Sequence, residues 1–163
     1  FGCRLKSASR TWNSEFADEV GIQRCSVEQL FRCCNVISIH LPLQADTLGY
    51  ITADLIGSMQ KGSILLNTSR AAIIDNVALV GAIESGLIGG AAIDVFDEEP
   101  NIYPYQNSEN VILSPHIGSH TLETRQAMEK MAINNVITVH QFLEGQPHSD
   151  GNKLLNYLMS VSV

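Results

Sequence analysis

Five short segments of apolar, mostly β-branched residues are the feature that most limits how this chain can fold. Each is about as long as a strand, and none shows the regular polar alternation of a sheet that faces water on one side. Strands buried on both faces have this composition, which is typical of parallel sheets covered by helices. The expected strands are Arg4–Ala8, Val36–His40, Ser63–Asn67, Ala91–Val95 and Val111–Ser114.

Helical signals lie between and after these strands. Ser26 and Gln29 have the spacing of a capping box, and Asp75 and Thr121 are good N-caps for the segments that follow them. Met128 and Met131 lie on an apolar stripe that indicates core packing. The expected helices are Val27–Cys33, Ala53–Ser58, a segment from the cap Asp75 to Gly86, and one from the cap Thr121 to Gly145. Strands alternating with helices predict an α/β fold with a doubly wound parallel sheet, as in Rossmann-like domains.

Composition excludes several classes of function. Lys and Arg total 10 against 17 Asp and Glu, and no basic cluster follows a helix face, so nucleic acid is not expected as a partner. No apolar run has the length of a membrane helix, so no membrane association is expected. The four cysteines lack CxxC spacing, which predicts free, mostly buried thiols and a cytoplasmic location. Because the chain begins with Phe1 and has no secretory signal, we expect a piece of a longer protein.

Charged side chains follow several of the expected strands. In doubly wound sheets, ligands bind outside the carboxyl ends of the strands, where Arg70, Asp94 and His116 are expected to converge. Each has an ordinary structural interpretation: Arg70 as an ion-pair partner, Asp94 as a helix cap and His116 as a buried histidine. Their coincidence at one edge favours an active site.

The residue types at this edge suit a particular chemistry. Histidine exchanges a proton near neutral pH, a neighbouring glutamate can orient it, and arginine matches a carboxylate. Together they suit reduction of a 2-keto acid, provided that a hydride donor is bound. The histidines lack the paired spacing of a metal site, and no activated Ser or Cys motif is present, so no metal is expected.

Three stretches of sequence carry a family resemblance. They are Asn67–Asp75, Gly90–Phe96 continuing to Glu99 and Pro100, and Ser114–Ser119. In order and spacing, across Phe1 to Pro147, they resemble the D-isomer-specific 2-hydroxyacid dehydrogenases. Ala71 and Ala72 replace the glycine pair more usual in that family, without touching the chemistry.

The resemblance implies roles for individual residues. Arg70 would bind the substrate carboxylate and keto oxygen, His116 would be the acid–base, and Glu99 would orient His116. The cofactor would contact Pro42, Thr47, Ser69, Asp94 and Gly118. The resemblance also implies a small 2-keto acid as substrate and a homodimer formed through the cofactor domain.

One family feature is absent. No GxGxxG loop follows a strand, since Gly86, Gly89 and Gly90 precede one. We therefore expect residues 1–147 to be a partial dinucleotide-binding domain, incomplete at its N-terminus, with Phe1 and Gly2 ending a lost helix. Residues 148–163 are expected to form a tail that docks on the absent substrate domain. Such a fragment should not turn over alone.

The first expected strand indicates which dinucleotide is preferred. NAD-binding domains place an acidic residue after the second strand of the βαβ unit, and here that position holds Ser9, followed by Arg10. A hydroxyl and a guanidinium suit a 2′-phosphate, so NADP is favoured over NAD, although Arg10 can also be read as a solvated loop cation.

Two other interpretations compete with a dehydrogenase. One is a non-enzymatic, NAD(H)-sensing binding module or corepressor of the same fold; retention of Arg70, Glu99 and His116 fits turnover better. The other is a flavodoxin-like or receiver domain, which would need an early acidic cluster or a phosphate-binding loop, and neither is present.

Overall fold

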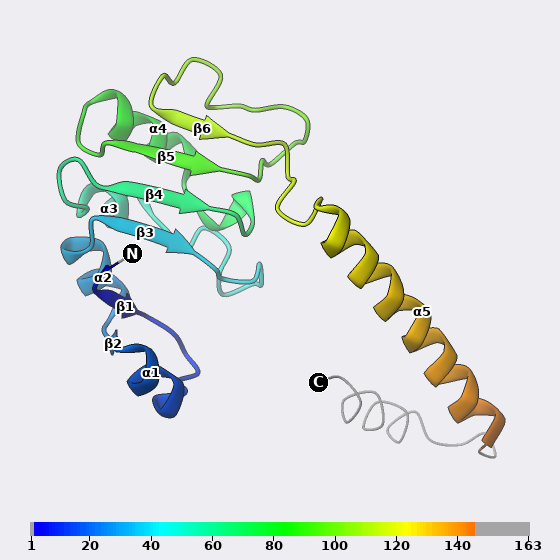
Figure 1. Ribbon diagram of the computed structural model, residues 1–163. Coiled ribbons are helices and arrows are strands. Elements are labelled where there is room, and N and C mark those ends of the chain that lie inside the picture. The colour runs from blue at the N-terminus through cyan, green and yellow to red at the C-terminus, as the bar shows by residue number, and fades with distance from the viewer. Residues whose placement is uncertain (1, 146–163) are drawn as a thin grey trace. The chain divides into compact units, whose positions relative to one another are not determined.

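The computed structural model describes residues 2–145, in which strands and helices alternate along the chain (Figure 1). Every pairing between the named strands is parallel, which confirms the predicted α/β class. The elements are β1 (Leu5–Ser7), α1 (Ser14–Val20), β2 (Ile22–Arg24), α2 (Val27–Cys33), β3 (Val36–Ile39), α3 (Ala53–Gly57), β4 (Ile64–Asn67), η1 (Ala71–Ile73), α4 (Asn76–Glu84), β5 (Gly90–Ile93), β6 (Val111–Leu113) and α5 (Leu122–Gly145).

The strands form two sheets. β1 pairs with β2, and a four-stranded sheet follows the order β3-β4-β5-β6. In the larger sheet Ile37 lies beside Leu65, and Leu65 lies beside Ala91, so that these side chains share one face.

The core lies on that face. Ile37, Leu65 and Ile93 are at most 2% exposed and belong to one apolar cluster with Phe31 of α2 and Leu79 of α4. Figure 1 shows α3 and α4 behind the four strands. Residues of both helices belong to the apolar cluster that also contains the strand side chains, so the helices pack on this face of the sheet.

The opposite face of the larger sheet is open, which differs from the prediction of strands buried on both faces. Val36, Ile64 and Ile112 are 56%, 42% and 74% exposed, and they alternate with buried neighbours in β3 and β4. The reason is that no helix within residues 2–116 covers this face.

The helix α1 and the strand β2 were not predicted from the sequence. Asn13 caps α1 by accepting a hydrogen bond from the backbone N–H of Phe16, and Gly21 ends it in the left-handed region. The strand that follows has only three residues. The five predicted strands and the predicted helices agree with the structure to within one or two residues, and the capping box of Ser26 and Gln29 is present.

The chain divides into two compact units, residues 1–116 and 117–163. In the second, the Thr121 hydroxyl accepts a hydrogen bond from the N–H of Thr124 at the start of α5, as expected of a cap. Met128 and Met131 are 51% and 65% exposed, so the second unit by itself does not bury the stripe that was predicted to pack in a core. The expected boundary at Pro147 and the tail 148–163 lie outside the described residues.

All four cysteines are free, as predicted. Cys3 and Cys33 are nevertheless exposed, and Cys25 and Cys34 only partly covered, so the expectation of mostly buried thiols is wrong. Cys33 is exposed at the C-terminal end of α2, where its sulfur accepts a hydrogen bond from the Lys6 ammonium at 3.1 Å.

Candidate active site at the carboxyl edge of the sheet

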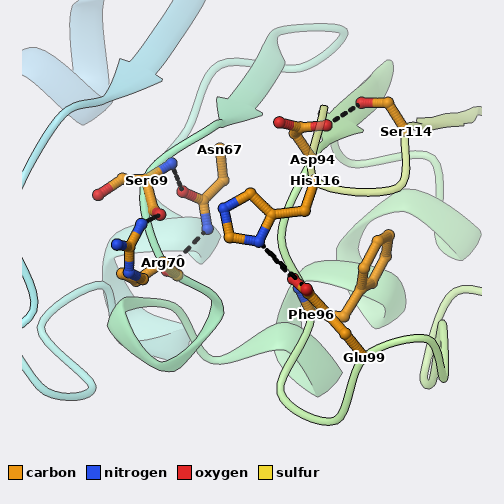
Figure 2. Close-up of polar contacts among 8 residues, drawn as sticks. All are labelled: Asn67, Ser69, Arg70, Asp94, Phe96, Glu99, Ser114 and His116. Carbon is orange, nitrogen blue, oxygen red and sulfur yellow. Dashed lines mark hydrogen bonds and ion pairs between the residues drawn. The ribbon is translucent and has the colours of Figure 1, made fainter. Parts of the chain in front are cut away.

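The parallel strands β4, β5 and β6 bring their carboxyl ends to one edge. Arg70 follows β4, Asp94 follows β5, and His116 follows β6. Parallel pairing places these ends side by side, and Figure 2 shows the side chains around the edge.

His116 and Glu99 are in direct contact. The Nδ1 atom of His116 lies 2.9 Å from Oε1 and 3.1 Å from Oε2 of Glu99 (Figure 2). Because a carboxylate only accepts, Nδ1 carries the proton, and Nε2 is left to face away from Glu99. The Glu99 side chain also accepts the backbone N–H of Phe96 at 3.4 Å, which fixes it within its own loop. Both side chains remain partly open, at 44% and 40% exposure, so a substrate can reach the imidazole.

The backbone at His116 has a left-handed conformation, with φ of 52°. The His116 N–H donates to the carbonyl of Ser114, which turns the chain sharply just after β6. This turn directs the imidazole toward Glu99 rather than along the strand.

Arg70 is held at the same edge by a buried amide. Asn67, with no exposed surface, accepts the N–H of Ser69 and donates to the carbonyl of Arg70, both at 3.0 Å. The Arg70 guanidinium donates to the carbonyl of Ser69 at 2.7 Å. Within the described residues it has no hydrogen bond or ion pair to Glu99 or His116, so the structure brings Arg70 to the edge without joining it to that pair.

Asp94 and Ser114 connect two neighbouring strand ends. The Ser114 hydroxyl donates to Oδ1 of Asp94 at 2.6 Å, and Asp94 is only 6% exposed. Ser114 and Asn67 belong to stretches that suggested the family, yet sequence reasoning gave neither a role. Their signal was position: a short polar residue at the end of a buried strand.

Pro42, Thr47 and Ser69 lie together around the end of β3. The Thr47 hydroxyl donates to the carbonyl of Pro42 at 2.6 Å and accepts the N–H of Gln44 at 2.8 Å. The Ser69 hydroxyl donates to the carbonyl of Leu41. These hydroxyls close the loop after β3 and fasten it to the loop after β4.

A second group of polar side chains lies beyond β1. The Arg10 guanidinium pairs with Asp46 at 2.7 Å and contacts Gln44 at 3.3 Å, while the Ser9 hydroxyl donates to the carbonyl of Thr11. Arg24, which sequence reasoning missed, donates to the carbonyl of Ser9 at 3.4 Å. Arg24 therefore contacts Ser9, while the guanidinium of the neighbouring Arg10 is bound to Asp46 and Gln44.

Hydrogen bonds between two buried side chains, Tyr105 and Asn76, and the exposed Asp97 support the loop that carries Glu99. The Tyr105 hydroxyl donates to the Asn76 side chain at 2.7 Å, and Asn76 donates to Asp97 at 3.2 Å. Burial and, secondarily, the Asp97 carboxylate raise the pKa of Tyr105 above its usual range. The Phe96 ring packs edge-on against Tyr105, at 6.4 Å between centroids. These contacts tie α4 to the segment from Phe96 to Glu99.

The polar residues fit the two ends of a dinucleotide. Ser9, Arg10 and Arg24 line a cavity of about 1500 Å³ and can hold a ribose phosphate, while Asp94 at the edge of the sheet can hold a nicotinamide ribose or carboxamide. Gly118 belongs to the second unit. No glycine-rich turn follows a strand in the described residues, so the cradle for the pyrophosphate is not among them.

Between residues 2 and 145, no group of three or more His, Cys, Asp or Glu side chains is placed to hold a metal ion. No described helix combines the length and apolar character needed to cross a membrane.

Known proteins resemble this chain in both sequence and structure. The glyoxylate reductase of Aeropyrum pernix is 42% identical over 143 residues, which are 86% of this chain and 43% of that protein. Glyoxylate/hydroxypyruvate reductase B of Serratia proteamaculans is 35% identical over 139 residues, covering 84% and 43%. The chain thus spans less than half the length of these curated relatives.

Solved structures of dehydrogenases superpose on the fold. A glyoxylate reductase from Paecilomyes thermophila gives a TM-score of 0.77 at 34% identity, covering 83% of this chain and 41% of that one. The apo D-mandelate dehydrogenase of Rhodotorula graminis gives 0.78 at 28% identity, covering 83% and 40%.

The family is fixed by a sequence profile. The profile for the NAD-binding domain of D-isomer-specific 2-hydroxyacid dehydrogenases matches residues 1–118, the segment that contains β1 to β6 and His116. This chain therefore belongs to the D-isomer-specific 2-hydroxyacid dehydrogenases.

Proposed function

We propose that this chain is part of an oxidoreductase that transfers a hydride between a nicotinamide dinucleotide and a 2-keto or 2-hydroxy acid, with D specificity. The observation that carries the proposal is the His116–Glu99 pair, 2.9 Å apart at the sheet edge where Arg70 also lies. The relatives named as glyoxylate reductases support this class of substrate.

The roles of the side chains follow from their chemistry. The Arg70 guanidinium binds the substrate carboxylate as a bidentate donor and polarises the adjacent keto group. The bound nicotinamide would supply the hydride to the keto carbon. His116 then gives the proton on Nε2 to the keto oxygen, and Glu99 stabilises the doubly protonated imidazole before transfer. The products are the hydroxy acid and a neutral His116, which regains a proton from solvent.

Substitution of His116 in the full-length parent tests this assignment. His116→Ala should lower kcat for keto-acid reduction by roughly 10² to 10⁴, the usual contribution of an acid–base group. His120→Ala, which removes an exposed imidazole four residues away, is the matched control and should leave kcat unchanged. Unchanged turnover in His116→Ala would refute the role of His116, and no turnover in the wild-type full-length parent would favour the NAD(H)-sensing module.

The proposal includes a preference for NADP over NAD. Ser9, Arg10 and Arg24 support it, since a hydroxyl and two guanidinium groups suit a 2′-phosphate. Arg10 pairs with Asp46 here, but the side chains are 73% and 57% exposed, and such surface pairs contribute little stability. Arg10 can therefore leave Asp46 and bind a phosphate at little cost in free energy.

The ratio of kcat/KM for NADPH to that for NADH measures this preference. The ratio should exceed one in the full-length enzyme, and Arg10→Ala should lower it by about 10- to 100-fold, the value of one hydrogen bond to a charged group. Arg32→Ala, at the last turn of α2, is the control. A ratio below one, or a ratio that Arg10→Ala leaves unmoved, would contradict the preference.

The proposal also includes the oligomeric state and the location of the whole protein: a homodimer in the cytoplasm. The cytoplasmic location is supported by the four free cysteines, which suit a reducing compartment. The homodimer rests on the family resemblance, and the mass of the full-length protein in solution tests it directly.

A further inference from the structure

Three of the four cysteines gather around one lysine, outside the candidate active site. The Lys6 ammonium on β1 donates a hydrogen bond to the Cys33 sulfur at 3.1 Å. The sulfurs of Cys34 and Cys25 also lie near enough to act on the charge of Lys6. Cys33 ends α2 shortly before β3 begins, so the cluster lies by the amino end of β3 and not at the carboxyl edge that holds His116.

The Lys6 ammonium has a sulfur as its partner instead of a carboxylate. The chain carries 17 acidic residues, yet within residues 2–145 none of them forms an ion pair with Lys6. The hydrogen bond to Cys33 is the largest cause that raises the pKa of Lys6 above its usual value. The ammonium therefore stays protonated and stabilises negative charge on the Cys33 sulfur.

The cysteines differ in how readily they can react. Burial, more than any other cause, raises the pKa values of Cys25 and Cys34, which keeps both of them as thiols. Cys33 is exposed and accepts the hydrogen bond from Lys6. Cys3 is exposed too, but no ammonium lies beside it in the described part of the chain. Because the thiolate is the nucleophile, Cys33 is the sulfur best placed to react.

The charge around Cys33 indicates which reagents it favours. Cys33 lies in the last turn of α2, where the carbonyl end of the helix disfavours an anion. The ammonium of Lys6 and the guanidinium of Arg32, one residue earlier in the same turn, supply positive charge there. A small molecule with carboxylates is attracted to these cations, and a cationic one is repelled.

We propose that Cys33 is a site of reversible thiolation by small disulfides that carry carboxylates. The Cys33 thiolate attacks one sulfur of the disulfide, whose S–S bond breaks and leaves its electron pair on the other sulfur. A mixed disulfide forms on Cys33, and the released thiolate takes up the proton that the Cys33 thiol gave up. Cys33 is thus oxidised and one half of the small disulfide is reduced, with no other reagent. Excess free thiol reverses the step.

Reaction of the reduced full-length parent with two disulfides of opposite charge tests this proposal. Oxidised glutathione is anionic and cystamine is cationic, and peptide mass mapping gives the rate at each cysteine. With oxidised glutathione, Cys33 should react faster than Cys3. Lys6→Met should lower the ratio of the Cys33 rate with oxidised glutathione to that with cystamine by about two- to fivefold, the effect of an exposed ion pair. Lys6→Arg keeps the charge and should keep the ratio.

A second lysine provides the matched control. Lys130→Met removes the same charge from α5 and should leave the ratio unchanged. The ratio cancels any change in the fraction of Cys33 present as thiolate, so a merely structural role of Lys6 would not move it. A faster reaction at any of the other three cysteines, or a ratio that Lys6→Met leaves unmoved, would overturn the proposal. The measurement involves no cofactor or turnover, so its outcome is independent of the proposed activity.

Discussion

The proposed function makes Glu99 a positioning residue, whose contribution is separable from substrate binding. It holds Nδ1 of His116 at 2.9 Å and is itself held by the N–H of Phe96, so its effect on the reaction passes through the imidazole. Arg70, by contrast, has its guanidinium exposed to an incoming carboxylate. The two side chains should therefore affect different kinetic constants.

Glu99→Gln should lower kcat with little change in the KM for the keto acid. The amide keeps the size of the side chain but cannot stabilise a charged imidazole, and we expect a loss of roughly 10² to 10⁴ in kcat. Arg70→Ala should instead raise KM strongly. Steady-state kinetics of both variants in the full-length enzyme provide the test. An equal rise of KM in both variants would show that Glu99 acts on substrate binding.

For individual residues, the sequence predicted which residues form the candidate site better than it predicted their contacts with one another. Arg70 and His116 could be found because each follows a strand with parallel neighbours, whereas Glu99 was identified through the family resemblance. The pairing of Arg10 with Asp46 could not, because the two are 36 positions apart and joined only by folding. Asn67 was also overlooked as a supporting residue, although its position at the end of a buried strand was a signal.

At the scale of elements, the hydrogen bonds that join Tyr105, Asn76 and Asp97 stabilise the loop between β5 and β6. Tyr105 is 2% exposed and Asn76 is 8% exposed, so neither can replace this hydrogen bond with one to water. The loop that carries Glu99 is thereby fastened to α4.

Tyr105→Phe should lower the free energy of unfolding by about 1 to 3 kcal/mol, because it leaves the Asn76 oxygen buried without a donor. Burial raises the pKa of Tyr105, so the unfolded chain releases this proton first, near pH 10, and the folded state loses stability above that pH. Tyr105→Phe has no phenol at this position and should not show this loss of stability at alkaline pH. Denaturant unfolding at pH 8 and above pH 10 measures both effects. If the free energies of unfolding of the two proteins fell by the same amount between pH 8 and above pH 10, the expected effect of Tyr105 ionisation would be contradicted.

The elements themselves were largely predictable, for local reasons. The capping box of Ser26 and Gln29 and the cap at Asp75 act within four residues and mark α2 and α4. The strand β2 was missed because its three residues contain a single apolar side chain, Ile22, and follow α1 with only Gly21 between. The open sheet face was missed because Val36 and Ile64 are apolar whether or not a helix covers them.

For the whole molecule, the described residues supply the edge that is proposed to bind the substrate, but only part of a cofactor site. It spans 43% of the Aeropyrum pernix relative, and no described residue supplies a glycine-rich phosphate turn. Catalysis depends on positioning and on excluding water, and both need more than this edge.

The 163-residue chain alone should therefore show no measurable reduction of keto acids with either NADPH or NADH. It should also melt below the range of about 45 to 65 °C that is usual for intact domains, since β1 and β3 each lack a neighbour. Absorbance of the reduced cofactor and thermal unfolding are the measurements. Turnover above the background rate would contradict the first expectation.

The left-handed backbone at His116 has a consequence for how this position tolerates change. Glycine adopts φ near 52° without steric cost, whereas other L-residues generally lose about 1 to 2 kcal/mol there. A library screened for thermal robustness alone would thus be enriched in glycine at position 116 over alanine, although both discard the imidazole. Chemistry, not conformational ease, favours histidine at this turn, and engineering for heat resistance would have to keep position 116 fixed.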